Sequence, residues 1–230
     1  KTSPLARLAK DGKTIKVELD SEVVIQKLSH DIYSSWKSGL RELYNNEARA
    51  CRITWKSSTV VDNKGKNDPV SFSTDALKKP EIHITIDPVE RQLIIEGRDS
   101  QGITVEVFDK SLRVLGVSSN FDSKEIGQMG MGFAGYTMIF EAMKLDSYSR
   151  DTNEKWSVLA DGGINFKVLG NPTMRSYGTR LSGTYKSNID ADDMIEQIKI
   201  LSRFSHVKTF IHLTEDTRNH NSGVSMCESF

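Results

Sequence analysis

The chain has 230 residues, of which 37% are hydrophobic and 27% are charged, as expected for a soluble globular protein of one domain or a closely joined pair. Basic and acidic side chains both number 31, so the formal net charge is zero. This balance excludes the net positive charge that is typical of nucleic-acid-binding proteins, so any DNA contact has to be local or lie elsewhere.

Cysteine usage and hydropathy bear on the compartment. Cys51 and Cys227 lie far apart, and neither belongs to a metal-spaced cluster or a disulfide framework, so we expect a reducing, cytoplasmic setting. No apolar run approaches the roughly 20 residues of a membrane span, and we see no signal-peptide pattern, so no membrane partner is expected. Because the first residue is Lys1, we expect a processed product or a piece excised from something longer.

The N-terminal part is predicted to hold an arm, a short strand and a long helical region. Residues 1–19 form the predicted arm, and the apolar alternation at 14–19 favours a strand. A helical pattern begins near Ser21 and continues, with room for a break, to about Cys51. Its apolar positions predict one buried face. Four polar residues recur at helical spacing on another face: Ser35, Glu42, Asn46 and Arg49.

The middle of the chain predicts strands followed by a helix. Residues 56–79 are rich in Ser, Asp, Asn, Lys and Gly, which indicates a strand or two linked by an exposed loop. Strands are predicted at 81–87, where isoleucines alternate, and at 92–98, where the apolar run 93–95 indicates burial on both faces. A helix is expected next, ended by Gly116. Its apolar side would carry Val105, Phe108, Leu112 and Leu115.

The segment 117–129 is polar and could serve as a lid. A glycine-rich stretch at 126–135 overlaps its end and continues beyond it. It runs into an apolar helical pattern made of Phe133, Tyr136, Thr137 and Phe140. A glycine-rich turn that opens a helix points unpaired N–H groups and the positive end of the helix dipole at a ligand, which suits phosphate. Taken alone, the pattern also fits a tight connection with no ligand.

The remaining residues predict a strand meander, one helix and a final strand. Strand character is found near 144–150, 155–160, 163–169 and 179–186. Residues 190–204 are expected to form an amphipathic helix with an acidic start, which suits the helix dipole. A last strand is predicted at 207–213, and 214–230 is predicted to be a polar tail.

Two parts of the sequence carry side chains that could take part in catalysis or ligand binding. Glu42 and Asn46 are one helical turn apart, so their side chains emerge on the same side, where a carboxylate can polarise a water and an amide oxygen can bind Mg²⁺. The same spacing is common on solvated helix faces. Asp99, at a predicted strand end, also fits an ordinary turn residue. The residues alone leave both alternatives open.

Four segments in order read RELYNNEARAC, IIEGRDSQGI, IGQMGMGFAG and YGTRLSGTY, at 41–51, 94–103, 126–135 and 177–185. Their order and spacing resemble the four successive motifs of the GHKL ATPases, which include gyrase, ninety-kilodalton heat-shock chaperones, histidine kinases and the mismatch-repair MutL proteins. The resemblance runs from about residue 20 to 213, the predicted ATP-binding domain. It implies the Bergerat ATP-binding fold, an α/β two-layer sandwich of a mixed, largely antiparallel sheet with helices on one face.

The resemblance implies a role for each matching residue. Glu42 would be the general base, and Asn46 the Mg²⁺ ligand. Asp99 would accept a hydrogen bond from the adenine amino group, Gly102 would let the backbone pass close to the base, and Thr179 would support the adenine contact. The lid and phosphate loop would use Ser118, Ser119, Asn120, Gly127, Gln128, Met129, Gly130, Met131, Gly132 and Phe133.

The chain departs from the family pattern at two places. Arg49 stands where topoisomerase and chaperone patterns usually have Asp, and Glu47 stands where Ser is frequent. The second motif tends to read Asp, any, Gly, any, Gly, whereas Asp99 reaches a glycine only at Gly102, as if one residue were missing. These departures alter the motif on the helix and the one at the strand end.

The expected function is Mg²⁺-dependent ATP binding and hydrolysis that drives a conformational and dimerisation switch. The first motif and the segment 192–213 most resemble the ATPase domain of the topoisomerase VI B subunit, with DNA and other domains or subunits as candidate partners. The glycine stretch resembles the chaperone version equally well, so a chaperone-like ATPase is an alternative. A nucleotide-binding interaction module with little turnover is another, because Arg49 and the Asp99 loop alter the site.

Overall fold

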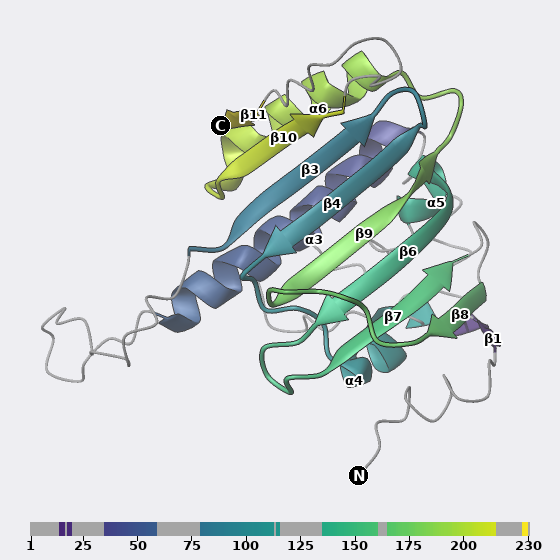
Figure 1. Cartoon of the computed structure of the whole chain (residues 1–230), viewed down its shortest axis with the longest axis vertical. Coiled ribbons are helices and arrows are strands. Elements are labelled where there is room, and N and C mark those ends of the chain that lie inside the picture. Colours follow the sequence, from purple (N-terminus) through teal and green to yellow (C-terminus); the bar gives the residue numbers. More distant parts are fainter. Residues whose placement is uncertain are drawn as a thin grey trace, which may run out of the picture.

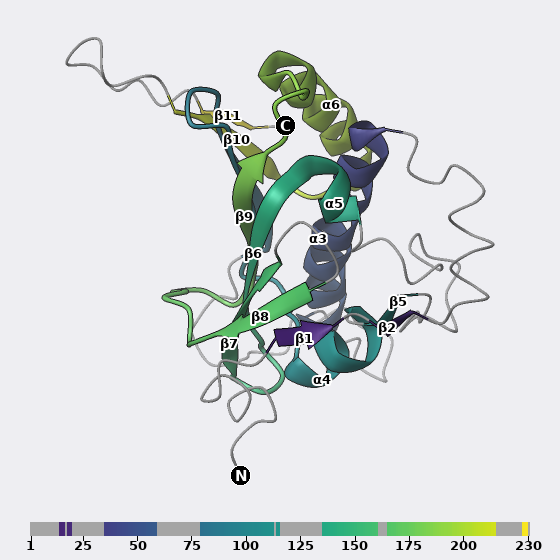
Figure 2. The same ribbon diagram turned by 90° about the vertical axis from the view of Figure 1, so that its right-hand side faces the viewer.

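The computed structural model describes residues 14–16, 18–19, 35–58, 79–112, 114–115, 135–160, 165–214 and 227–229. The fold has two layers, a large twisted sheet and a layer of helices that covers one of its faces (Figures 1 and 2). This arrangement confirms the predicted α/β sandwich.

The large sheet has nine strands in the order β1-β8-β7-β6-β9-β4-β3-β10-β11. They are β1 (Thr14–Lys16), β3 (Glu81–Asp87), β4 (Gln92–Arg98), β6 (Phe140–Tyr148), β7 (Lys155–Ala160), β8 (Asn165–Leu169), β9 (Gly178–Tyr185), β10 (Thr209–Leu213) and β11 (Cys227–Ser229). Among the described strands of this sheet, β3 and β10 pair in parallel and all other neighbours are antiparallel. The predicted mixed, largely antiparallel sheet is therefore confirmed.

The helical layer is built mainly from two long helices. The helices are α3 (Trp36–Ser58), α4 (Val105–Val107), which continues as a π-helical segment (Phe108–Leu112), α5 (Tyr136–Ile139) and α6 (Ala191–Ser205). Helices α3 and α6 lie on the same face of the sheet (Figure 2). The core lies between the layers and includes Leu40 and Leu43 of α3, the alternate isoleucines of β3, and Leu93 and Ile95 of β4. Each such side chain contributes roughly 1.5–3 kcal/mol through burial.

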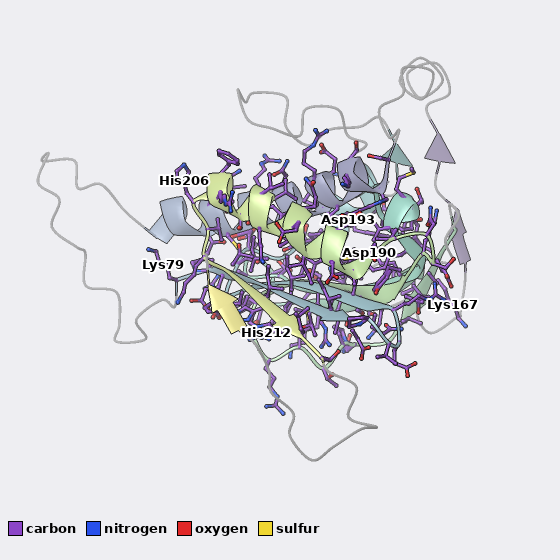
Figure 3. The ribbon with its side chains drawn as sticks, turned by 90° about the horizontal axis from the view of Figure 1, so that it is seen from above. Lys79, Lys167, Asp190, Asp193, His206 and His212 are labelled. Atoms are coloured by element: carbon purple, nitrogen blue, oxygen red, sulfur yellow. The ribbon has the colours of Figure 1, made fainter. Side chains whose placement is uncertain are left out.

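Helix α6 begins where the sequence predicts. The Asp190 carboxylate accepts hydrogen bonds from the backbone N–H groups of Asp192 and Asp193, at 2.9 and 3.0 Å. These bonds satisfy two donors that a helix start leaves unpaired. The helix ends at His206, which has a left-handed conformation with φ 56°, and Figure 3 shows the two capping residues at opposite ends of α6.

Several predicted elements have different limits in the structure. Helix α3 continues to Ser58, so residues 56–58 are helical and the strand predicted from 56 is wrong there. The helix that starts at Val105 ends at Leu112, because Val114–Leu115 forms strand β5, which pairs in parallel with β2 (Glu18–Leu19).

Two apolar patterns also have a different structure from the one predicted. Among the described residues, the helix after the glycine stretch has only the four residues of α5, and Phe140 already begins β6, so the helical pattern predicted to reach Phe140 is wrong at that residue. In β4, Ile94 is half-buried while Leu93 and Ile95 are buried. The strand therefore buries one face, because the helices cover only that side of the sheet.

The two ends of the chain contribute strands at the two edges of the sheet. Within the predicted arm, β1 pairs with β8, and within the predicted tail, β11 pairs with β10. In the part of the chain that the structure describes, no helix has the length and apolar character that crossing a bilayer requires.

Candidate functional site

Helix α3 carries the first motif. Glu42 and Asn46 are one turn apart on it, as predicted; Glu42 is half-buried and Asn46 is exposed. The Glu42 carboxylate forms an ion pair with Nε of Arg41 at 3.5 Å. Two oxygen-bearing side chains therefore lie on the same side of α3, both at least partly accessible to solvent.

The end of the glycine-rich stretch lies against α3. A Cβ atom at Gly39 would lie 2.5 Å from the Gly135 carbonyl oxygen, and one at Gly135 would lie 3.0 Å from the Gly39 Cα and carbonyl oxygen. A side chain at Gly39 is incompatible with this backbone contact, and one at Gly135 would need a small shift of the chain. Gly135 is the last residue of the stretch, so its end meets α3 less than one turn before Glu42.

The rest of the glycine stretch and the lid lie outside the described residues, so the roles predicted there stay predictions. These residues are Ser118, Ser119, Asn120, Gly127, Gln128, Met129, Gly130, Met131, Gly132 and Phe133. The segment 117–129, expected to form the lid, is also outside them.

Asp99 follows the last residue of β4 and has φ 55°, a conformation uncommon for residues other than glycine. Its carbonyl oxygen accepts a hydrogen bond from the Arg150 guanidinium at 3.0 Å. The Ser100 hydroxyl donates to the Gly97 carbonyl at 3.2 Å. These bonds fold the chain sharply at the strand end, and Asp99 itself is half-buried there.

Gly102 lies against β6. Its φ is 70°, and a Cβ atom would lie 2.3 Å from the Tyr148 carbonyl oxygen. The next residue, Ile103, is held by Ser147, whose hydroxyl accepts from the Ile103 N–H at 2.8 Å and donates to its carbonyl at 2.9 Å. The absence of a side chain at Gly102 thus allows the loop after β4 to contact the end of β6. The contact predicted between Gly102 and the nucleotide base stays a prediction.

Thr179 is the point where the fourth motif contacts the first. It lies on β9, opposite Gly97 of β4 and Ser147 of β6. Its hydroxyl donates a hydrogen bond of 2.5 Å to Oε1 of Glu47, and both side chains are buried. A buried polar contact therefore connects the sheet to α3 at this point.

Glu47 is a buried carboxyl group that the sequence marks only as a departure from the motif. Only 4% of the surface of Glu47 is exposed to solvent. Burial raises the pKa of Glu47 from about 4.5 to about 7; the Thr179 hydrogen bond opposes this and the negative charge of Glu96 adds to it. Glu47 stands four residues after Leu43, within the apolar stripe of α3, and this position was the available signal for its burial.

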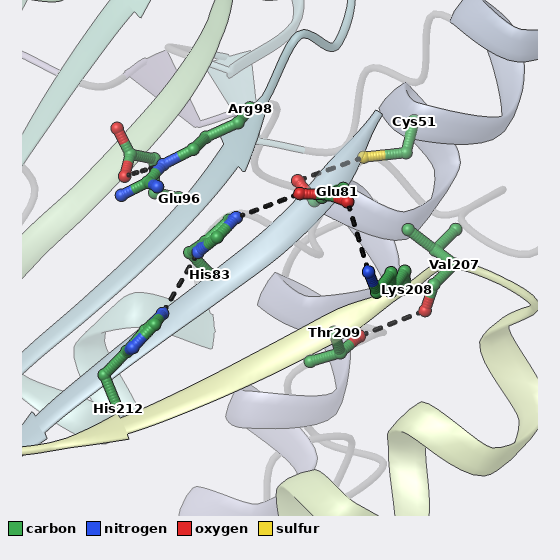
Figure 4. Close-up of polar contacts among 9 residues, drawn as sticks. All are labelled: Cys51, Glu81, His83, Glu96, Arg98, Val207, Lys208, Thr209 and His212. Atoms are coloured by element: carbon green, nitrogen blue, oxygen red, sulfur yellow. Dashed lines mark hydrogen bonds and ion pairs between the residues drawn. The ribbon is translucent and has the colours of Figure 1, made fainter. Parts of the chain in front are cut away.

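A second polar cluster occupies the opposite face of the sheet. Nδ1 of His83 and Nε2 of His212 lie 3.0 Å apart, and Nε2 of His83 lies 3.3 Å from the Glu81 carboxylate (Figure 4). Burial and the nearby Arg98 charge lower the pKa of His83, while the Glu81 hydrogen bond opposes this shift. Among the described residues no group of three or more His, Cys, Asp and Glu side chains is placed to hold a metal.

Comparison with known proteins finds chaperones. The chain is 27% identical over 202 residues to the chaperone protein HtpG of Nitrobacter winogradskyi, covering 80% of this chain and 29% of that protein. It is 25% identical over 175 residues to HtpG of Mesorhizobium japonicum, covering 71% and 26% of the two chains. It is 22% identical over 226 residues to the endoplasmin homolog of Dictyostelium discoideum, covering 89% and 28%.

These similarities imply a GHKL-type domain, the type that the four ordered motifs indicate. They support the chaperone-like interpretation and give no support to the topoisomerase VI one. No family model matches the chain. The chain spans less than a third of the length of these curated relatives.

Proposed function

We propose that the chain is a chaperone-like GHKL domain that binds ATP and hydrolyses it in the presence of Mg²⁺. One observation carries the proposal: α3 is the element that the other described motifs meet. Gly135 contacts it at Gly39, and Thr179 is hydrogen-bonded to it through Glu47. Segments far apart in sequence thus gather around the helix that carries the candidate base and metal ligand.

The phosphate end of the site would lie by the outward side of α3. Glu42 would accept a proton from the attacking water, because it is a half-buried carboxylate at the end of the glycine stretch. Asn46 would hold Mg²⁺, and the fit is chemical: Mg²⁺ keeps several waters and needs only one or two protein oxygens besides the phosphates. When bound, Mg²⁺ would neutralise charge on the phosphates.

The base end of the site would lie at the paired ends of β4 and β9. Thr179 stands there on the helix-facing side, and Asp99 follows β4 directly. A carboxyl group at this place would accept from the adenine amino group and would disfavour guanine, whose corresponding substituent is an acceptor.

The wider role that we propose is supported by the comparisons. The matched proteins are chaperones, so we propose that ATP drives closure and self-association as part of a chaperone-like cycle. A topoisomerase VI-like role, with DNA as partner, would need support that the neutral charge of the chain does not supply.

The proposal is tested by measuring ATP binding and ATP hydrolysis side by side, with and without Mg²⁺, on the wild-type chain and Glu42→Ala. We expect the wild type to bind and hydrolyse ATP only with Mg²⁺, and the variant to bind ATP but hydrolyse it about 10²- to 10⁴-fold more slowly. Glu141→Ala, which alters an exposed carboxylate paired with Arg91, is the matched control and should behave as wild type.

Two outcomes would count against the proposal. Absence of ATP binding by the wild-type chain would refute the nucleotide site. Binding with equal and negligible turnover in the wild type and Glu42→Ala would instead favour an interaction module that uses nucleotide without hydrolysing it.

A further inference from the structure

The Glu47 carboxyl group has one oxygen that the described protein groups leave unpaired. Oε1 accepts from Thr179, whereas Oε2 is buried and has no hydrogen-bond partner among the described residues. A buried polar atom without a partner destabilises the fold, because it has lost its hydrogen bonds to water. Such an atom, in a site proposed to bind a ligand, is a place where a ligand group can supply the missing bond.

The missing side chain of Gly97 leaves room for this oxygen. A Cβ atom at Gly97 would lie 2.3 Å from Oε2 of Glu47, so the carboxyl group occupies the volume that a side chain on β4 would fill. Gly97 pairs directly with Thr179 on β9. The helix therefore places a carboxyl group where the helix-facing side of β4 would otherwise carry a side chain of its own.

This carboxyl group lies close to the end of the strand pair. The last register pair of β4 and β9 is Arg98 with Gly178, one residue beyond the pair that contacts Glu47. Past it, β4 turns away at Asp99. Oε2 is thus adjacent to the place where the proposed function puts the base, and the carboxylate of Asp99 is two residues farther along β4 than Gly97.

We propose that Glu47 of α3 is the residue that reads the nucleobase, accepting a hydrogen bond at Oε2 from the exocyclic amino group of adenine. Thr179 orients the carboxyl group through Oε1, and Gly97 makes room for it. This inference rests on the proposed ATP function and assigns its base specificity to the helix rather than to Asp99.

The chemistry of the unpaired atom selects the ligand group. The Thr179 hydroxyl donates to Oε1, so an ionised Glu47 offers Oε2 as an acceptor. The 6-amino group of adenine is a donor, whereas the 6-oxo group of inosine or guanine is an acceptor and would face the carboxylate unfavourably. A site built to pair a buried polar group rejects an analogue that leaves it unpaired.

The test compares binding of ATP and inosine triphosphate, which carries an oxo group in place of the 6-amino group, by calorimetry on the whole 230-residue chain at pH 8, where Glu47 is ionised. We expect the wild type to bind ATP at least tenfold more tightly. In Glu47→Gln the amide can still accept from Thr179 and can donate at the former Oε2 position. This variant should lose at least tenfold in ATP affinity and should prefer the inosine nucleotide or bind both equally.

Three controls make the result specific. Glu47→Asp, which withdraws the carboxyl group by one methylene, should weaken ATP binding without reversing the preference. Glu141→Gln should keep wild-type affinities, because Glu141 pairs with Arg91 at an exposed position. Thermal unfolding of each variant checks that the fold is retained.

The outcomes separate this inference from the function on which it rests. If the wild type binds neither nucleotide, the proposed function falls and the inference falls with it. If the wild type prefers ATP and Glu47→Gln keeps the same preference, only the inference is overturned. Collapse of the preference in Asp99→Asn, with Glu47→Gln unchanged, would assign base reading to the strand end instead.

Discussion

Two carboxyl groups on α3, five residues apart, have opposite surroundings. Glu42 is half-buried and paired with Arg41, whereas Glu47 is almost fully buried and contacts Thr179. Position on the helix decides this difference, because five residues turn the side chain from the outward face to the sheet-facing side. Pairs of acids in different environments commonly divide the chemical tasks of a site. Our proposals give catalysis to the first and recognition to the second.

The largest predicted effect separates these two tasks by steady-state kinetics. Glu42→Gln should lower kcat by about 10²- to 10⁴-fold, since it removes a proton acceptor from the reaction. In Glu47→Gln the loss in kcat/KM should lie mostly in KM, because the contact with the base is made before and during the reaction. A fall in kcat of similar size in both variants would erase the distinction.

The next effect concerns stability and pH. Between pH 4.5 and about 7, folded Glu47 holds a proton that the unfolded chain has released, so the free energy of unfolding falls as pH rises through this window. The full loss is about 3 kcal/mol. Glu47→Gln removes this term and should unfold with a higher free energy than wild type at pH 8.

Denaturant unfolding at a series of pH values measures this term. Glu141→Gln provides the comparison, because it also removes a carboxylate but from an exposed ion pair. If the difference between wild type and Glu47→Gln stays constant from pH 4.5 to 8, Glu47 does not titrate in the folded state as its burial predicts.

A smaller effect is expected at the strand position beneath Glu47. Gly97→Ala places a methyl group 2.3 Å from Oε2, so the carboxyl group has to move, at a cost of about 1–3 kcal/mol in the free energy of unfolding. ATP affinity should fall as well. Gly170→Ala is the control, since a Cβ atom there meets nothing within 4 Å, and equal stability of the two variants would contradict the packing described.

The smallest effect tests a polar contact of α3 that is fully paired. The Tyr44 hydroxyl lies 2.9 Å from the Ser205 hydroxyl and 2.8 Å from that of Thr209. Tyr44→Phe should lower the free energy of unfolding by about 1 kcal/mol and leave ATP binding intact. Tyr177→Phe, which removes an exposed hydroxyl bonded to Asn153, should change it by less than about 0.5 kcal/mol.

Helices and strands whose positions depend on local residue spacing were predictable from the sequence. The alternating isoleucines located β3, and Asp190 located the start of α6, because local spacing and a capping side chain determine both. The apolar residues near 140 misled, since Ile139 and Phe140 are both buried although one ends α5 and the other begins β6. A short apolar run does not distinguish helix from strand.

The residues of the candidate site also differ in whether the sequence predicted their positions. Helical spacing placed Glu42 and Asn46 on one side of α3, and the structure keeps them there. Glu47 was not among the predicted site residues, because an isolated Glu is normally assigned to solvent. Its burial depends on Thr179, 132 residues away, and on the missing side chain of Gly97. Contacts of that range come from the tertiary fold, which spacing along one helix does not contain.

The backbone contact between Gly39 and Gly135 has a consequence for engineering the domain. Each residue is limited by main-chain atoms of the other, so shortening a neighbouring side chain cannot compensate for a side chain at either position. A side chain at position 39 would therefore force the two backbones apart, and a side chain at position 135 would require a smaller shift. A glycine segment grafted from a relative would keep this contact with α3 unchanged only if its last residue is also glycine.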